Sequence, residues 1–164
     1  MSRLLRPFPM LLCGLALGIF SRLMDICIDF LGDVFSRMPV WILLGVLIAI
    51  GSPSPRRAAT NILPFCLGML LAYYAVAVIT DGVYGRVYII GWTVFALCSP
   101  LFAAVTWLCR GKGVLPLLLR LGVAVCAVFS TLLLSGDLRT HDFLLLAAVV
   151  WLLFAAPRLP TPSA

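Results

Sequence analysis

The chain has 164 residues, of which 63% are hydrophobic and 11% are charged, and its formal net charge is +6. A soluble globular domain averages about 45–50% apolar and about 25% charged residues, so this composition excludes an ordinary soluble domain. The basic excess does not indicate nucleic acid as a partner, because the basic residues stand in pairs beside hydrophobic segments.

The hydrophobic segments predict an all-α fold, a polytopic transmembrane helix bundle. A transmembrane helix needs roughly 20 apolar residues, so the chain has room for about six spans with short connections and for no extramembrane domain. We therefore treat residues 1–164 as a single integral membrane domain. The predicted spans cover residues 8–24, 34–51, 60–80, 87–109, 115–135 and 142–156.

The second of these segments is shorter than a membrane is thick. The apolar run from Pro39 to Gly51 has 13 residues. That is about 20 Å of helix, whereas the hydrocarbon core is about 30 Å thick. We expect a longer helix that begins near Val34 and carries Arg37 at its outer end, and a half-span is the alternative.

The charges are sorted between the two sides of these spans. One side carries eight basic residues and no acidic one: Arg3, Arg6, Arg56, Arg57, Arg110, Lys112, Arg120 and Arg158. The other side carries all six acidic residues and four basic ones: Asp25, Asp29, Asp33, Asp81, Asp137, Asp142, Arg22, Arg37, Arg86 and Arg139. Because Lys and Arg mark cytoplasmic connections, we predict that both termini are cytoplasmic, in a multi-pass protein of a bacterial inner membrane.

The first outer connection is an amphipathic segment with regularly spaced aspartates. Asp25, Asp29 and Asp33 are four residues apart, with Arg22 before them and Arg37 after them, so one helix would carry all five in a stripe. The stripe is either a lid or binding surface for a cationic ligand, or a solvated face with ordinary pairs Arg22–Asp25 and Asp33–Arg37. We predict no metal site, because a single helix face cannot enclose an ion.

Few polar side chains fall inside the spans. Tyr73 and Tyr74 in the third span need a hydrogen-bond partner or a wet cavity, and Trp92 could face the same pocket. Structural bonding is the alternative for the tyrosines. His141, the one histidine, is either a proton-responsive outer gate or a solvated loop residue. The candidate ligand-binding residues are thus Asp25, Asp29, Asp33, Tyr73, Tyr74 and Trp92.

Gly14 and Gly18 form a G-x-x-x-G pair, which places both glycines on one helix face and lets another helix approach closely. Six helices, cytoplasmic termini, this small-residue face and a long outer connection are together similar to the substrate-binding components of energy-coupling-factor vitamin transporters. The similarity is one of topology and not of a sequence motif. In that family the small-residue face docks the transmembrane coupling subunit, so the resemblance implies that role for Gly14 and Gly18.

Catalytic motifs are absent from the sequence. It has no His-Glu-x-x-His, no Gly-x-Ser-x-Gly and no Gly-rich loop ending in Lys-Ser/Thr, so we expect no enzymatic activity and no cofactor. We predict an integral membrane protein that binds or helps to transport a small solute from the outer face. The alternative is a structural or accessory subunit that packs against other membrane subunits. The lipid bilayer is the partner in both cases.

Overall fold

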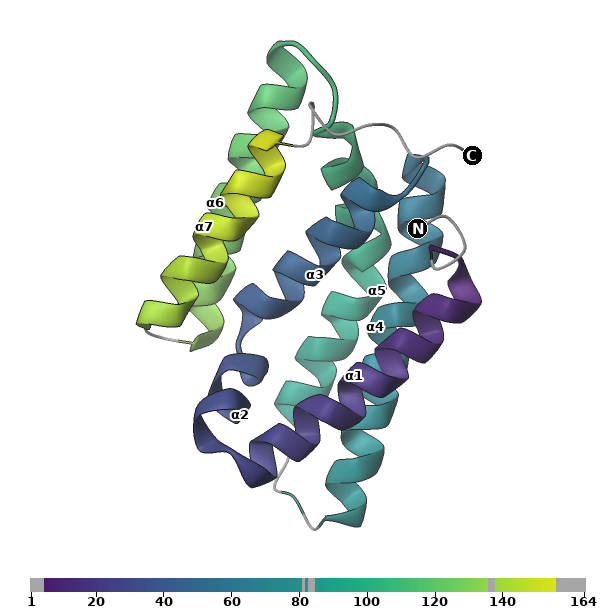
Figure 1. Ribbon diagram of the computed structural model, residues 1–164, viewed down its shortest axis with the longest axis vertical. Coiled ribbons are helices and arrows are strands. Elements are labelled where there is room, and N and C mark those ends of the chain that lie inside the picture. The colour runs from purple at the N-terminus through teal and green to yellow at the C-terminus, as the bar shows by residue number, and fades with distance from the viewer. Residues whose placement is uncertain (1–4, 81, 83–84, 136–137, 156–164) are drawn as a thin grey trace.

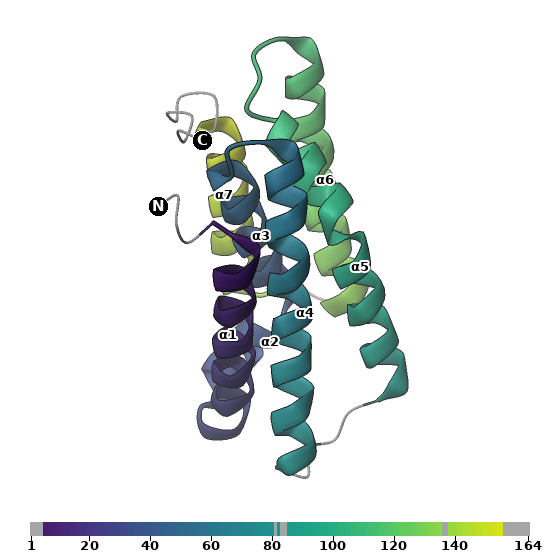
Figure 2. The same cartoon turned by 90° about the vertical axis from the view of Figure 1, so that its right-hand side faces the viewer.

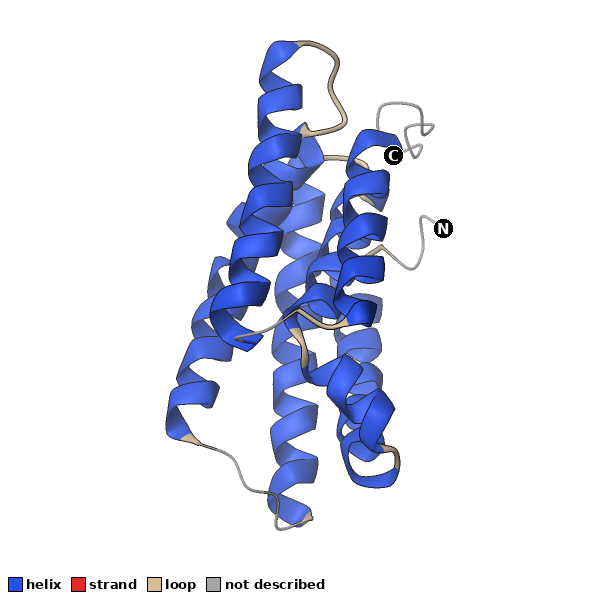
Figure 3. Ribbon diagram, turned by 90° about the vertical axis from the view of Figure 1, so that its left-hand side faces the viewer, coloured by secondary structure: helices blue, strands red, loops and turns tan. Residues whose placement is uncertain are grey.

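The computed structural model describes residues 5–80, 82, 85–135 and 138–155. Within these ranges the fold is all-helical (Figure 3), as the composition predicts. Figure 1 shows the elements in order, which are α1 (Pro7–Cys27), α2 (Asp29–Ser36), α3 (Met38–Gly51), α4 (Pro55–Ile79), α5 (Arg86–Leu108), α6 (Val114–Ser135) and α7 (Thr140–Ala155). Arg3, Asp81, Tyr84, Asp137 and Arg158 lie outside the described residues.

In the described part of the chain, four helices are long and apolar enough to cross a membrane, which is compatible with a multi-pass integral membrane protein. These stretches are Pro7–Cys27, Pro55–Ile79, Ile89–Leu108 and Val114–Leu133. Helices α3 and α7 are apolar but have only 14 and 16 residues, or about 21 and about 24 Å of helix. The number of crossings and the side that faces the cytoplasm stay predictions.

The helices run alternately in opposite directions, so their ends gather at two poles (Figures 1 and 2). At one pole α1, α4 and α6 begin and α3, α5 and α7 end, and we call it the arginine end after Arg56, Arg57 and Arg110. At the other pole α1 ends, α2 lies and α7 begins, and we call it the aspartate end after Asp33 and Asp142. The charge sorting of the sequence is therefore also a sorting in space.

Helices α1 and α4 lie side by side and approach closely at glycines (Figure 2). A Cβ atom added at Gly14 would collide with the carbonyl oxygen of Phe65, and one at Gly18 with that of Met69. From the other side, a Cβ at Gly68 of α4 would lie 2.8 Å from a carbonyl oxygen of α1. Only glycine permits this spacing, so the G-x-x-x-G face of α1 serves a contact inside the chain.

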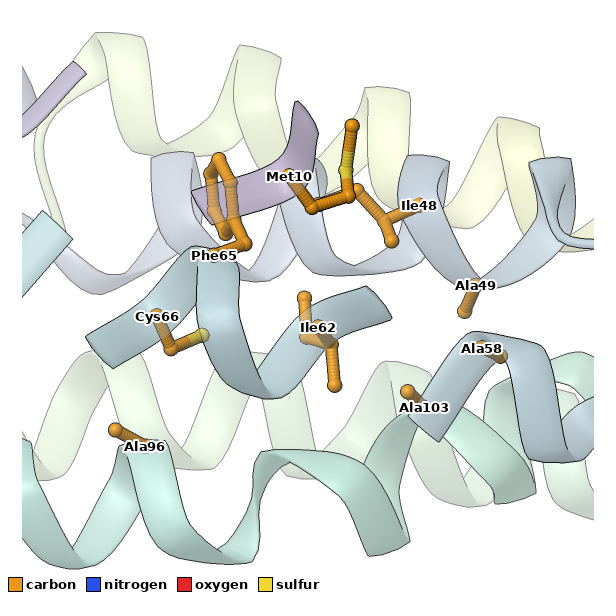
Figure 4. Close-up of a cluster of buried hydrophobic side chains, with 9 residues drawn as sticks. All are labelled: Met10, Ile48, Ala49, Ala58, Ile62, Phe65, Cys66, Ala96 and Ala103. Atoms are coloured by element: carbon orange, nitrogen blue, oxygen red, sulfur yellow. The ribbon is translucent and has the colours of Figure 1, made fainter. Parts of the chain in front are cut away.

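Small buried residues hold the centre of the bundle together. A cluster of nine buried side chains joins α1, α3, α4 and α5 (Figure 4): Met10, Ile48, Ala49, Ala58, Ile62, Phe65, Cys66, Ala96 and Ala103. Four of the nine are alanines, which let helix backbones come near one another. A second cluster joins α3, α6 and α7, with Cys109 just after α5: Val46, Ile50, Cys109, Ala127, Leu146, Val149 and Leu153.

The first outer connection is not one helix, so the predicted five-residue stripe is wrong. Helix α1 ends at Cys27, and Ile28 has an extended backbone with φ −143° and ψ 97°. Helix α2 then folds back against the end of α1, where a Cβ at Gly32 would lie 2.7 Å from the Cα atom of Asp25. A glycine at this position allows the reversal, and the break means that Asp25 and Asp33 do not share one helix face.

The expected helix from Val34 through Arg37 is also interrupted. Arg37 has an extended backbone, with φ −93° and ψ 147°, and α3 starts at Met38. The cause is Pro39, which has no N–H to donate to the carbonyl of Phe35 and whose ring would clash with it in a continuous helix. That carbonyl accepts a hydrogen bond from the Trp41 indole Nε1 instead, at 2.8 Å.

Helix α4 begins at Pro55, five residues before the predicted start at Thr60. Ser54 is its N-cap, and the Ser54 hydroxyl oxygen accepts the backbone N–H of Arg57 at 3.2 Å. Proline is well suited to the first helical position because its missing N–H has no partner there in any helix. The connection between α3 and α4 is therefore shorter than the predicted gap between the spans 34–51 and 60–80.

Candidate functional site

Asp25 is engaged within the chain, in a small network that joins α1 to α4. The Tyr73 hydroxyl donates to Asp25 Oδ2 at 2.5 Å. Arg22 lies 3.7 Å from the same oxygen, and its guanidinium carbon stands 5.8 Å from the centre of the Tyr73 ring. Arg22 also contacts Gly82 just after α4. The carboxylate and the hydroxyl thus satisfy each other, which is the structural alternative foreseen for Tyr73.

Of the other predicted ligand residues, Tyr74 lies beside Tyr73, and Trp92 packs on a residue of its own helix. The Tyr74 ring packs edge-on against Tyr73, with centroids 5.4 Å apart, and Trp92 packs in the same way against Phe95 at 6.0 Å. The side chain of Asp29 lies outside the described part of the structure. A ligand-binding role for these residues stays a prediction.

Asp33 belongs to a second network, at the aspartate end. It comprises Asp33, Arg37, Arg139, His141 and Asp142, and we call it the α2–α7 network. Asp33 lies 3.5 Å from Arg37 and 2.6 Å from Arg139. Arg37 also pairs with Asp142 at 2.6 Å, and Asp142 accepts the backbone N–H of Arg139 at 2.9 Å. The network ties α2 and the start of α3 to the start of α7.

The Arg37–Asp142 pair is buried, which the sequence pattern did not indicate. The side chain of Asp142 is fully buried and that of Arg37 is 8% exposed. Charged pairs inside a membrane protein are costly to desolvate and mark candidate functional positions. The available signal was weak: Arg37 and Asp142 each stand at the predicted outer start of an unusually short apolar segment.

Two polar atoms of this network face each other without a hydrogen bond. His141 Nε2 lies 3.6 Å from Asp33 Oδ2 and 3.7 Å from Asp142 Oδ1. Both His141 Nε2 and Asp142 Oδ1 are buried and lack a hydrogen-bond partner among the described residues. His141 is thus a partly buried residue of the first turn of α7, not a solvated loop residue. No group of three or more His, Cys, Asp or Glu in the described ranges is placed to hold a metal ion.

An apolar cavity of about 490 Å³ lies between α3, α4, α5 and α6. Buried side chains such as Val46, Ile62 and Ala127 form its inner wall. The remaining lining residues include Trp41 at the start of α3 and Gly122 on α6. None of the described residues that line it is charged. A cavity of this size and character can take up a small apolar molecule.

The rim of the cavity is formed by exposed side chains of two neighbouring helices. Leu101 and Phe102 of α5 are 67% and 54% exposed, and Leu118 of α6 is 58% exposed. In a membrane such side chains face the lipid tails. The rim of the cavity thus opens toward the hydrocarbon.

Two serine hydroxyls of the cavity already donate their hydrogens to the backbone. Ser99 donates to the carbonyl of Ala96 at 2.7 Å, and Ser130 donates to that of Ala127 at 3.1 Å. Hydroxyls in membrane helices commonly bond to their own backbone in this way. Each serine oxygen keeps a lone pair that can accept a hydrogen bond from a ligand.

The cavity is not where the sequence predicted one. Its described lining includes neither Tyr73 nor Tyr74 nor Trp92, although Phe95, which packs on Trp92, is part of it. Its position depends on how α6 packs against α3 and α5, and no motif in the sequence reports that packing.

No family model, no curated protein and no solved structure matches the chain.

Proposed function

We propose that this chain is an integral membrane protein that binds a small, uncharged, lipophilic molecule in the cavity between α3, α4, α5 and α6. The cavity carries the proposal: its volume of about 490 Å³ lies within the range of about 300–1,000 Å³ found for small-molecule sites. An apolar cavity holds water poorly and takes up apolar molecules instead. Burying a charge against this lining would be costly, so the ligand is uncharged.

The ligand reaches this cavity from the bilayer. The rim residues Leu101, Phe102 and Leu118 are exposed on the outside of the helices and also line the cavity, so they join it to the lipid-facing surface. Ser99 and Ser130 have acceptor capacity to spare, so a ligand with one hydroxyl or amide donor binds better than a pure hydrocarbon.

The charged residues support this route over capture of a cation at the outer face. Asp25 is hydrogen bonded to Tyr73, and Asp33 is paired with Arg37 and Arg139. A cationic ligand would have to displace these partners.

The glycine face of α1 does not favour the accessory-subunit alternative. Gly14 and Gly18 are already covered by α4 of the same chain. We propose a binding protein without enzymatic activity.

Two glycines provide a matched test of the cavity. A Cβ at Gly122 or at Gly91 would meet no atom within 4 Å, so a side chain can be introduced at either position without a clash at its first carbon. Gly122 lines the cavity, whereas Gly91 is exposed on α5 and does not belong to the described lining. Gly122→Leu should therefore fill the cavity, whereas Gly91→Leu should change only the lipid-facing surface. Both variants replace a helical glycine with leucine, so their effects on helix propensity are matched.

The assay is photo-crosslinking of a diazirine-bearing long-chain alcohol to the protein in lipid nanodiscs, with the labelled peptides mapped by mass spectrometry. We expect labels on α3, α5 and α6 at the lining residues, reduced about tenfold in Gly122→Leu, equivalent to about 1.4 kcal/mol, and unchanged in Gly91→Leu. Labels spread over all lipid-facing helices, with the same yield in both variants, would refute the proposal.

A further inference from the structure

Helix α2 is a short element that packs on the end of α1 and is tied to α7 by charges at its carboxyl end. It has eight residues and is bounded by extended residues at both ends, Ile28 and Arg37. Its Asp33 is bonded to Arg139, and Arg37, which follows it, is bonded to Asp142. A short helix between two non-helical residues can change its position as a unit when the contacts that hold it change.

His141 stands at the centre of these contacts. Its Nε2 atom lies 3.6 Å from Asp33 of α2 and 3.7 Å from Asp142 of α7. Among the described residues, the charged groups that face it are these two carboxylates and, beside them, Arg37 and Arg139, each of which pairs with a carboxylate. A proton on His141 would place one positive charge between the two carboxylates.

The two unpartnered atoms indicate what such a proton would do. Among the described residues, His141 Nε2 and Asp142 Oδ1 are buried without hydrogen bonds although they are neighbours. A neutral imidazole carries its hydrogen on only one of its two nitrogens, whereas an imidazolium always donates from Nε2. Protonation therefore guarantees a charge-assisted donor between the carboxylates of α2 and α7.

We propose that the α2–α7 network is a proton-responsive latch, in which protonated His141 bridges Asp33 and Asp142 and holds α2 against the start of α7. When the proton leaves, the bridge weakens, and the arginines remain as the charged ties between α2 and α7. Histidine is the side chain that commonly serves as a proton-responsive switch in proteins.

The latch also reaches the cavity, through Trp41. The Trp41 indole donates to the carbonyl of Phe35 in α2 at 2.8 Å, and the same side chain lines the cavity. Movement of α2 would free this indole and alter the end of the cavity that lies toward the latch. This consequence rests on the proposed binding function, whereas the latch itself does not.

Hydrogen–deuterium exchange of the full chain in nanodiscs tests the latch. The quantity compared is the protection factor of the α2 amides, which is corrected for the intrinsic pH dependence of exchange. In the wild type it should rise about tenfold from about pH 8 to about pH 5.5, while that of α6 amides stays constant. His141→Gln supplies a neutral donor of similar reach, so its α2 protection should not depend on pH. Asp33→Asn removes one of the two bridged carboxylates and should reduce the rise.

An unchanged α2 protection factor in the wild type, or the same pH response in His141→Gln as in the wild type, would overturn the latch. If His141→Gln does not fold, Asp33→Asn serves in its place. A pH response of α2 protection as large in Asp33→Asn as in the wild type would also contradict the bridge. Photo-crosslinking at both pH values separates the two proposals. A pH-dependent α2 without cavity labelling leaves the latch and removes the binding function, and cavity labelling with a pH-independent α2 does the reverse.

Discussion

Removing one partner of the Arg37–Asp142 ion pair should destabilise the protein strongly, whereas replacing both partners should not. The charged groups are 2.6 Å apart, and their side chains are 8% and 0% exposed. Water therefore screens the pair little, and whichever charge is left behind stays buried. Breaking such a pair costs about 3–5 kcal/mol, while replacing it with apolar residues of similar size is often neutral or stabilising.

The structure allows these values to be refined for each variant. Asp142→Leu leaves Arg37 with Asp33 at 3.5 Å, and Arg37→Met leaves Asp142 with the backbone N–H of Arg139. Each single variant then keeps one weaker partner, so we expect a loss of about 3 kcal/mol of unfolding free energy in each. The double variant should lose no more than about 2 kcal/mol, which gives a coupling energy of at least about 4 kcal/mol.

The assay is SDS-induced unfolding in mixed micelles, followed by circular dichroism, for the wild type and the three variants. The matched control is Arg139→Met. Its pair with Asp33 has the same 2.6 Å distance, but the two side chains are 52% and 29% exposed, so its loss should cost less than about 1 kcal/mol. If each single variant lost less than about 1 kcal/mol of unfolding free energy, and the loss in the double variant were the sum of the two, the Arg37–Asp142 pair would not behave as a buried ion pair.

Three further predictions concern other contacts. Gly14→Leu should force α1 away from α4, because its Cβ would collide with a backbone carbonyl. We expect the unfolding free energy in the same assay to fall by about 1–3 kcal/mol or more. A variant as stable as the wild type would contradict the close packing. Tyr73→Phe removes the hydroxyl that donates to Asp25 at 2.5 Å and should lower the unfolding free energy by about 1–3 kcal/mol. An unchanged unfolding free energy would contradict this expectation. Cys27 is exposed at the aspartate end, and Cys109 is buried at the arginine end. A membrane-impermeant maleimide added outside intact cells should label Cys27 and not Cys109, and an unlabelled Cys27 would argue against the predicted orientation.

Most of the helices could be predicted from local sequence patterns, and the ones that could not depend on tertiary contacts. Long apolar runs bounded by Pro, Gly and charged residues predict helices close to α1, α5 and α6, because the bilayer demands length and hydrophobicity. The break at Ile28 could not be read in this way, since Asp25, Asp29 and Asp33 keep a helical spacing across it. The reversal depends on Gly32 fitting against α1, which is a tertiary contact.

The charged pairs show the same division between local and distant contacts. The spacing of Arg22 and Asp25, and of Asp33 and Arg37, predicts the observed pairs at 3.7 and 3.5 Å. The pairing of Arg37 with Asp142, 105 residues later, has no local pattern. It arises from the packing of α3 beside α7, whose short lengths bring both charges to the same level.

The apolar cavity was beyond sequence reasoning for a related reason. Aromatic and hydroxyl residues within spans, such as Tyr73 and Ser99, are equally compatible with a cavity or with structural bonding. Tyr73 bonds to Asp25 and Ser99 lines the cavity, and only the packing of four helices separates the two cases.

If the cavity binds one lipophilic molecule, a fluorescent long-chain alcohol should bind saturably to the protein in nanodiscs once the signal of empty nanodiscs is subtracted. We expect one molecule bound per chain in the wild type and in Gly91→Leu. The affinity of Gly122→Leu should be at least about tenfold lower, which is about 1.4 kcal/mol. Non-saturating partition, or equal affinity for the wild type and both variants, would contradict binding in the cavity.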